Sequence, residues 1–445
     1  MNIVDIIEKK KSGKALTKDE IDFFIQGYSR GEMPDYQISA LLMAIWFKGM
    51  DNEEIANLTI SMVHSGKTVD LSRIKGIKVD KHSSGGVADT VSLPLVALVA
   101  ANGVPVAKMS GRGLGHTGGT IDKLESIPGF QVEFDIEKFI EIVNRVGGAI
   151  ISQSEELVLA DKKMYSLRDV TGTVDSMPLI ASSIMSKKIA AGSNAIVLDV
   201  KVGNGAFMQS LEDALVLSKT MVDIGNSLGR ETVAYITDMN QPLGETIGNS
   251  LEVIEAIDIL KGKGGMRLSG VIETLGGESL KLGGKAETLE EGKRIIRGSI
   301  QNGSGLKKFA EIIEAQGGNN NIIKDISLLP QPEFKFVVIA PLSGYLHFVQ
   351  TKSLGRLANF LGAGREKKED KIDLSVGVVF KKKIGDFIDK EEEIATIFAN
   401  DKRKGEQAAL DFLKYIEIKD EQTKPLPLLY YRVSKEGIEK LFNEG

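Results

Sequence analysis

The sequence contains no cysteine and only four histidines. Without thiols the chain forms no disulfide, thiolate metal site, iron–sulfur cluster or cysteine nucleophile. Four histidines leave little material for a His-built metal site, and the zinc-protease pattern H-E-x-x-H does not occur. The chain also lacks an excess of basic residues, because 61 acidic residues outnumber 56 basic ones. This balance argues against a nucleic-acid partner, whose binding face is normally strongly basic.

Long apolar runs are missing as well. The run at residues 93–101 stops well short of the ~20 residues that span a bilayer. Residues 1–11 are charged throughout and lack the apolar core of a signal peptide. We therefore expect a cytoplasmic protein without a membrane partner.

Glycine, in contrast, is abundant, with 48 in 445 residues against an average of ~7%. Nine glycines fall in residues 76–120 and twelve in residues 262–305. The first group has Lys, Ser and Thr beside it. The second has no such companions, so we expect its glycines in turns and at helix ends that cap the sheet domain.

The first 65 residues have helical periodicity. Thr17 and Glu20 form a capping-box pattern at the start of one helix. A second helix is expected to end at Gly49 and a third before Gly66, since glycine commonly follows the last turn. No strand pattern is present, so this segment predicts an all-α lobe.

From residue 77 onward, short apolar runs alternate with helical stretches. The alternation predicts a mostly parallel sheet covered by helices. The expected strands lie at 77–79, 104–107, 149–151 and 195–198, and the expected helices at 91–101, 135–146 and 211–228.

The fold class we predict is α/β: an all-α lobe, a mostly parallel-sheet α/β lobe and a C-terminal α+β domain. The boundaries are 1–66 for the helical lobe, with 162–192 returning to it, 67–161 and 193–329 for the α/β domain, and 330–445 for the C-terminal domain. The last boundary lies at a Pro-Gln-Pro sequence. The crossings between the first two lobes would be hinges.

Two glycine-rich clusters follow predicted strands. They are DKHSSGGVADT at 80–90 and KMSGRGLGHTGGT at 108–120. Glycine lets backbone N–H groups converge on an anion, and Lys with hydroxyls adds charge and donors. One such cluster is usually a tight turn, but two of them at neighbouring strand ends favour a phosphate cradle. Neither cluster has the P-loop pattern G-x-x-x-x-G-K-[ST]. The nearest match in the chain is SGKT at 65–68, but Ser61 stands where that pattern needs its first glycine.

A third cluster spans residues 165–174 and continues at 182–188. Ser183 and Lys187 are four apart, so they share a helix face and can point at one ligand. Arg168 and Lys187 would place two positive charges opposite the phosphate loops. Lys188 is expected to be a solvated surface lysine.

The second and third clusters carry a resemblance. KMSGRGLGHTGGTI at 108–121 and DVTGTVDSMPLIASSIMSKKIAAG at 169–192 resemble the signatures of pyrimidine-nucleoside phosphorylases of the thymidine phosphorylase family. The resemblance covers essentially the whole chain. It implies an active-site cleft between the first two lobes and a homodimer joined through the helical lobe. It also implies reversible phosphorolysis of uridine, thymidine and deoxyuridine, with inversion at C1′, to base and (2-deoxy)-α-D-ribose 1-phosphate.

By the same resemblance the site residues have roles. The catalytic residues would be His82, Arg168 and Lys187, with His82 near the 2-oxygen of the base. Two roles are open for His82, that of a general acid and that of a structural residue held by its neighbours. The nucleoside would be bound by Arg168, Ser183 and Lys187. Phosphate would be bound by Lys81, Ser83, Ser92, Lys108, Ser110 and Thr120. No cofactor is required.

The chain departs from the family pattern at a few positions. Ser84 and Ser92 stand where Thr is usual, Ala88 where Gly is usual, and Asn204 where Ser is usual. Ser92 keeps the hydroxyl, whereas the Cβ of Ala88 restricts the backbone. Ala88 matters because the resemblance allows a potassium ion, the one cofactor considered. Its site would be Ala88, Thr90, Leu243, Thr246 and Glu255.

Two other functions are considered. A phosphoribosyltransferase of the anthranilate type shares the architecture and a lysine–glycine loop, but it needs acidic residues for Mg²⁺, and no paired Asp-Glu lies in a suitable loop. A carrier protein would work through the C-terminal module, because residues 377–398 resemble half of a lipoyl-like barrel. No lysine lies at an evident hairpin tip, so we expect this module to be a structural appendage.

Overall fold

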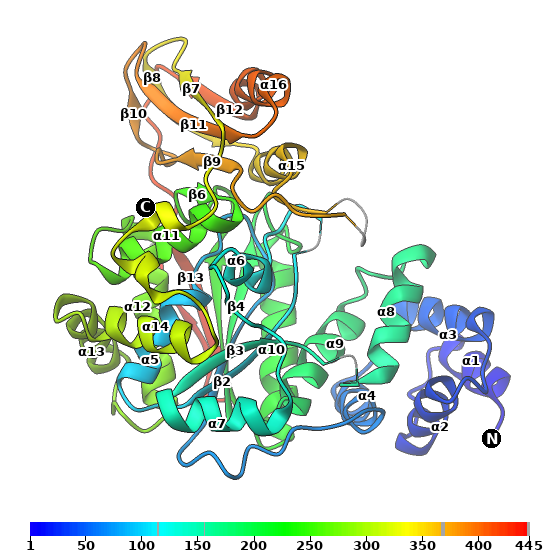
Figure 1. Ribbon diagram of the computed structural model, residues 1–445. Coiled ribbons are helices and arrows are strands. Elements are labelled where there is room, and N and C mark those ends of the chain that lie inside the picture. Colours follow the sequence, from blue (N-terminus) through cyan, green and yellow to red (C-terminus); the bar gives the residue numbers. More distant parts are fainter. Residues whose placement is uncertain (114, 155, 366–369, 443–445) are drawn as a thin grey trace.

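A computed structural model describes residues 1–113, 115–154, 156–365 and 370–442. Leu114, in the second glycine cluster, therefore lies outside the described residues. The helical lobe lies beside the central sheet, and the C-terminal domain lies at one end of the α/β lobe (Figure 1). In the described part of the chain, no helix is long and apolar enough to cross a membrane.

The helical lobe combines two segments that are far apart in the sequence. The expected capping box at Thr17 and Glu20 is present, and Asp51 with Glu54 forms a second one. The return segment packs on the first helices, as α9 lies against α4 and α8 against α2 and α3. The helices are α1 (Ile3–Lys11), α2 (Lys18–Ser29), α3 (Asp35–Lys48), α4 (Asn52–His64), α8 (Leu159–Thr171) and α9 (Met177–Ala190).

The central sheet has the strand order β1-β4-β5-β13-β14. Strands β1, β4 and β5 are parallel, and β2 and β3 form a separate parallel pair. The predicted parallel α/β lobe is thus confirmed. The strands are β1 (Val79–Ser83), β2 (Val106–Ser110), β3 (Gly148–Ser152), β4 (Ala195–Val202), β5 (Glu231–Asp238), β13 (Leu429–Ser434) and β14 (Gly437–Lys440).

Helices cover both faces of this sheet (Figure 1). Of the helices in the α/β lobe, α10 and α12 lie against the central sheet, and the others pack on the β2–β3 pair or on neighbouring helices. The helices of this lobe are α5 (Ser92–Ala101), α6 (Thr120–Glu125), α7 (Ile136–Val146), α10 (Leu211–Ser227), α11 (Asn249–Leu260), α12 (Met266–Leu282), α13 (Leu289–Gln301) and α14 (Ser304–Ala315). The second glycine group only partly marks turns. Gly277 and Gly292 lie inside α12 and α13, where a Cβ on Gly292 would come 2.3 Å from the carbonyl oxygen of Gly277. These glycines let two helix backbones approach closely.

The C-terminal domain is built from short antiparallel strands and two helices. One sheet has the order β6-β9-β11-β7 and the other β10-β8-β12. Two short 3₁₀ helices precede this domain: η1 (Asn320–Ile323), which packs on α14 of the α/β lobe, and η2 (Ile326–Leu328). The elements of the domain are β6 (Thr246–Ile247), β7 (Phe334–Ile339), β8 (Gly344–Val349), α15 (Thr351–Leu361), β9 (Gly377–Phe380), β10 (Phe387–Ile388), β11 (Glu393–Ala399), α16 (Lys402–Phe412), η3 (Leu413–Tyr415) and β12 (Ile416–Lys419).

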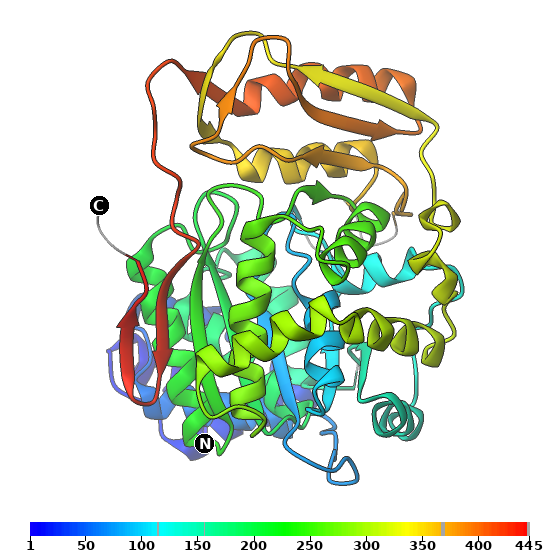
Figure 2. The same ribbon diagram turned by 90° about the vertical axis from the view of Figure 1, so that its left-hand side faces the viewer.

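The chain's last strands differ from the prediction of one C-terminal domain over 330–445. Strand β13 leaves that domain and pairs antiparallel with β5, and β14 pairs with β13 at the sheet edge (Figure 2). Val433 of β13 is buried in the hydrophobic core that the sheet shares with the helical lobe. An antiparallel strand covers the edge of β5, which would otherwise present unpaired backbone groups.

Candidate active site

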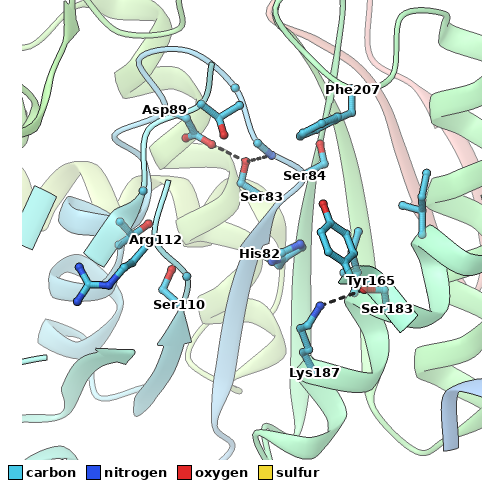
Figure 3. Close-up of a pocket in the computed structure, with 18 of the residues that line it drawn as sticks. His82, Ser83, Ser84, Asp89, Ser110, Arg112, Tyr165, Ser183, Lys187 and Phe207 are labelled. Carbon is cyan, nitrogen blue, oxygen red and sulfur yellow. Dashed lines mark hydrogen bonds between the residues drawn. The ribbon is translucent and has the colours of Figure 1, made fainter. Parts of the chain in front are cut away.

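A cavity of about 650 Å³ lies between the α/β lobe and the helical lobe. One wall comes from the loops that follow β1 and β2, and the other from α8 and α9. His82 projects from β1 toward Tyr165, Ser183 and Lys187 on the opposite wall (Figure 3). Every site residue that the resemblance implied for phosphate or base, except Lys81, lines this cavity.

Three hydroxyl groups on the α/β wall are free to bind a ligand. The side chains of Ser92, Ser110 and Thr120 line the cavity, and within the described ranges none of their hydroxyls has a hydrogen-bond partner in the protein. Ser92 is the first residue of α5, whose N-terminal dipole favours an anion. Three hydroxyl donors without protein partners among the described residues, one of them at the N-terminus of α5, are an arrangement that suits an anion.

The hydroxyl of Ser83 is already engaged. It donates to Asp89 Oδ2 at 2.5 Å and accepts from the backbone N–H of Gly85 at 3.2 Å (Figure 3). Burial alone would raise the pKa of Asp89, but Lys201 and Lys81 more than offset it, so the pKa lies below its usual value. The carboxylate is therefore ionised and holds Ser83 in place.

Lys81 differs from the other residues expected at the phosphate site, because it does not line the cavity. Its side chain is buried, with Nζ 3.1 Å from Asp199 Oδ2 and 3.8 Å from Asp89 Oδ2. Asp199 lies on the adjacent strand β4, where Lys201 approaches the same oxygen at 2.8 Å. Buried carboxylates need paired charges. Lys81 therefore neutralises the carboxylates behind Ser83 and does not line the cavity.

Lys108 and Lys188 approach the two oxygens of one buried carboxylate, that of Asp80. Lys188 Nζ donates to Asp80 Oδ2 at 2.9 Å, and Lys108 Nζ lies 3.5 Å from Oδ1. Lys188 is thus buried at the cavity wall, and the expectation of a solvated lysine was wrong. Burial, together with the charges of Lys188 and Lys81, lowers the pKa of Lys108 to about 8, although Asp80 opposes the shift.

Arg168 is held almost wholly by backbone oxygens. Its guanidinium donates to the carbonyls of Thr173 at 3.2 Å, Leu179 at 3.2 Å and Val174 at 2.6 Å. A guanidinium has five N–H groups, so two remain without a partner in the described part of the protein. The side chain is 1% exposed and lines the cavity. A carbonyl oxygen of a ligand could take the remaining donors.

Lys187 is fixed by Asp161 and Ser183. Its Nζ lies 2.6 Å from Asp161 Oδ2 and donates to Ser183 Oγ at 3.0 Å. The ring of Tyr165 lies beneath both cations, 5.6 Å from Arg168 and 5.7 Å from Lys187. The sequence patterns assigned Asp161 and Tyr165 no role. Asp161, Tyr165 and Arg168 are spaced four and three residues apart, so they lie on one face of a helix. This spacing is the sequence signal that would have identified Asp161 and Tyr165.

His82 lies between the two groups of cations. Burial and the charges of Lys188, Lys108, Lys81 and Lys187 lower its pKa well below the ordinary 6.5. The imidazole is therefore neutral at neutral pH, with one nitrogen able to donate a hydrogen bond and the other able to accept one.

Apolar side chains that the sequence patterns had not singled out complete the cavity. They include Phe207 and Met208 from the loop after β4, Leu217 of α10, and Val174, Ile180 and Ile184 near α9. Phe207 lies above Tyr165 on the same side of the cavity (Figure 3). Such residues suit the flat faces of a heteroaromatic ring.

The residues implied for a cation also come together. Glu255 Oε2 accepts from the hydroxyls of Thr246 at 2.9 Å and Thr90 at 3.2 Å. Ala88 adopts a left-handed φ of +56°, so its backbone takes the shape that a glycine would take there. Carboxylate, hydroxyl and backbone oxygens are the donors that a hard cation prefers. The chemistry of these residues therefore fits a potassium ion.

The chain matches known families along most of its length. Residues 4–66 match the glycosyl transferase family, helical bundle domain, residues 75–306 the glycosyl transferase family, a/b domain, and residues 345–419 the pyrimidine nucleoside phosphorylase C-terminal domain. Among solved structures, the anthranilate phosphoribosyltransferase of Thermus thermophilus covers 70% of this chain and 99% of its own, with a TM-score of 0.59. At 20% identity that likeness shows the fold alone.

Curated relatives are much more similar. The pyrimidine-nucleoside phosphorylase of Geobacillus stearothermophilus is 57% identical, and that of Bacillus subtilis (strain 168) is 56% identical. Each match extends over 400 residues, which are 90% of this chain and 92% of the relative. The resemblance seen in the sequence is thus confirmed, and the chain belongs to the pyrimidine-nucleoside phosphorylase family.

Proposed function

We propose that this cavity catalyses the reversible phosphorolysis of pyrimidine nucleosides. Uridine, thymidine or deoxyuridine would react with phosphate to give the free base and (2-deoxy)-α-D-ribose 1-phosphate. One observation carries the proposal: three unpartnered hydroxyls and Lys108 on one wall of the described cavity face Arg168 and Lys187 on the other. The first group suits an anionic nucleophile and the second an anionic leaving group.

On the α/β wall, Ser92, Ser110 and Thr120 would donate to phosphate oxygens, and Lys108 would supply charge. Ser83, oriented by Asp89, would border the same site. Phosphate is a weak nucleophile in water. Holding it and the sugar in attack geometry can remove about 7–11 kcal/mol of the barrier. Attack from the face of C1′ opposite the base inverts the configuration.

On the helical wall, charge develops on the base as the glycosidic bond lengthens. The electron pair of that bond leaves with the base, so its carbonyl oxygens become more negative. Arg168 has two donors left for them, and Lys187 is already oriented by Asp161. Preorganised donors of this type contribute about 3–4 kcal/mol each.

His82 would act through a hydrogen bond. A neutral imidazole can donate its N–H to the 2-oxygen of the base, whereas a general acid would have to be protonated first. Because the pKa of His82 is depressed by burial and by four lysines, we assign it to the hydrogen-bonding role.

The direct test is a phosphate-dependent release assay with thymidine, uridine, deoxyuridine and cytidine. We expect free base only when phosphate is present, and ³¹P and ¹H NMR should identify the α-anomer of the sugar phosphate. Release without phosphate, or a β-anomer, would contradict the mechanism. Coupling of anthranilate to phosphoribosyl pyrophosphate would instead establish the transferase activity.

We further propose that potassium binds beside the cavity. Ala88 and Leu243 would contribute backbone oxygens, and Thr90, Thr246 and Glu255 their side-chain oxygens. The support is the cluster of hydroxyls on Glu255 and the left-handed backbone at Ala88. A bound cation would hold the loops around 88–90 and 243–246 together and balance the charge of Glu255.

We also propose a cytoplasmic homodimer joined through the helical lobe. Helix α3 packs against both α1 and α8, and these helices expose large apolar side chains, namely Val4, Tyr36, Trp46, Phe47 and Val170. Tyr36, Phe47 and Val170 are more than 70% exposed. Exposed apolar side chains gathered on one lobe are typical of a subunit interface. The cytoplasm is where phosphate and nucleosides would be available to it.

A further inference from the structure

Helix α15 lies against two loops that carry cavity residues, although none of its own described residues lines the cavity. The first, called here the glycine loop, comprises residues 111–113 and 115–119, between β2 and α6. The second is residues 203–210, called here the Phe207 loop, between β4 and α10. Both loops belong to the α/β lobe, whereas α15 belongs to the C-terminal domain (Figure 1).

The N-terminal end of α15 is joined to the Phe207 loop through Asn204. Its Oδ1 accepts the backbone N–H of Thr351 at 2.7 Å, and its Nδ2 donates to the carbonyl of Val349 at 3.0 Å. Nδ2 also reaches the carbonyl of Asn240 at 3.1 Å. A serine has only one hydrogen to donate, so it could not replace both amide donors. Asn204 thus bridges the two domains three residues before Phe207.

Packing supports the same junction. A Cβ added to Gly205 would lie 2.4 Å from Thr351 Cγ2. The loop backbone therefore lies directly on the first residue of α15, with no space between them.

The opposite end of α15 is joined to the glycine loop. The Asn359 side chain donates to the carbonyl of Gly115, and a Cβ on Gly355 would lie 2.3 Å from the carbonyl oxygen of His116. Just beyond the helix, Arg365 Nη1 donates to Asp122 Oδ1 at 2.9 Å. Asp122 Oδ2 in turn accepts the backbone N–H of Gly113 at 2.7 Å.

The two loops also meet each other. His116 Nε2 lies 3.1 Å from the carbonyl oxygen of Gly205, and the rings of His116 and Phe207 are 5.9 Å apart. Each of the two loops therefore contacts α15, and the two loops also contact each other. A helix is much stiffer than a loop, so α15 sets the distance between them.

We propose that α15 is a strut that positions the glycine loop and the Phe207 loop for phosphorolysis, with Asn204 and Asn359 as its positioning residues. This inference rests on the proposed function. The glycine loop leads directly to Thr120 on the phosphate side, and the Phe207 loop covers the side that faces the nucleoside. Small misplacements of such groups have large effects on rate. The C-terminal domain is then part of the working site and not the appendage that we expected from the sequence.

The test is a double-mutant cycle with Asn204→Ala and Asn359→Ala. We expect each single change to lower kcat/KM about tenfold and the double change to lower it little further, since breaking either end disables the strut. Asn204→Ser serves as a milder variant if Asn204→Ala folds poorly. The matched control is Asn249→Ala, because Asn249 donates to the carbonyl of Ala363 and joins the same two domains away from the cavity. It should leave kcat/KM unchanged.

Amide hydrogen exchange gives a readout that does not depend on activity. Asn359→Ala should speed exchange not only in residues 111–119 but also in residues 203–210, with β4 and β5 unchanged. Exchange confined to the mutated end, or fully additive kinetic losses, would overturn the strut. So would equal losses in the Asn249→Ala control. If the wild-type protein showed no phosphorolysis, the proposed function would fail while the exchange measurement still tested the strut.

Discussion

Asp161 and Lys187 form an ion pair between α8 and α9, with Asp161 Oδ2 2.6 Å from Lys187 Nζ. Asp161 is 1% exposed, whereas the lysine side chain is one-third exposed toward the cavity. The buried carboxylate therefore anchors the ammonium without hiding it from a ligand. This pair determines where the positive charge of the helical wall lies.

Asp161→Asn should free Lys187 and weaken catalysis. We expect kcat with uridine to fall about tenfold, since a preorganised donor loses its orientation. Lys187→Ala should lower it further, by about a hundredfold or more. The matched control is Asp169→Asn on the exposed side of α8, which should keep wild-type kcat. Normal turnover in both Asp161→Asn and Lys187→Ala would remove the helical wall from the mechanism.

Arg168→Ala should affect both activity and stability. Loss of donors to the developing base anion should lower kcat/KM by about two to three orders of magnitude. The loss of their donors should lower the free energy of unfolding by about 1–3 kcal/mol for each of the three backbone carbonyls that stays buried and unpaired. Steady-state kinetics and urea unfolding measure the two effects separately. Because Arg168→Lys retains charge but not the fork of donors, it should recover stability only in part. Wild-type kinetics in a folded Arg168→Ala protein would refute the base assignment.

Lys108 makes the phosphate dependence sensitive to pH. Its pKa of about 8 means that the ammonium is present below pH 8 and is lost above it. The KM for phosphate should therefore rise as the pH increases past 8, while the nucleoside KM changes less. Lys108→Arg should shift this rise to higher pH, because arginine stays protonated. Lys108→Ala should raise the phosphate KM at all pH values. An unchanged phosphate dependence in Lys108→Ala would exclude Lys108 from the phosphate site.

The proposed potassium site predicts ion-specific stabilisation. Thermal unfolding should shift to higher temperature in KCl relative to choline chloride of equal ionic strength. The gain would be about 2.7 kcal/mol when K⁺ is at about a hundred times its Kd. Glu255→Gln should abolish the difference between the two salts. Equal melting temperatures for the wild type in both salts would rule the site out.

The proposed dimer predicts a molecular mass near twice that of the 48.2 kDa chain in sedimentation equilibrium. Tyr36→Glu together with Phe47→Glu should produce monomers, because two charges cannot be buried in an apolar interface without partners. Met266→Glu is the matched control, as Met266 is 91% exposed on α12 in the other lobe. A wild-type monomer, or dissociation by the control alone, would argue against this interface.

Much of the architecture follows from local patterns. The capping box at Thr17 and Glu20, the stop at Gly49 and the alternation of strands and helices are visible in short windows of sequence, because each depends on neighbouring residues. The glycine clusters likewise predicted loops that carry lysine and hydroxyl donors, since glycine beside Lys, Ser and Thr is a local signal. The return of β13 and β14 to the sheet had no such signal, because strand pairing depends on distant partners.

The sequence by itself determined the family, the two glycine-rich loops and the helix that carries Ser183 and Lys187. Only the tertiary structure decided which lysines reach the cavity. Lys81 pairs with Asp199 on the neighbouring strand and does not line the cavity, while Lys188 pairs with Asp80 and lies at its wall. The physical reason is the same in both cases: a buried carboxylate must be paired, and which ammonium pairs with it depends on elements that meet only in the folded chain.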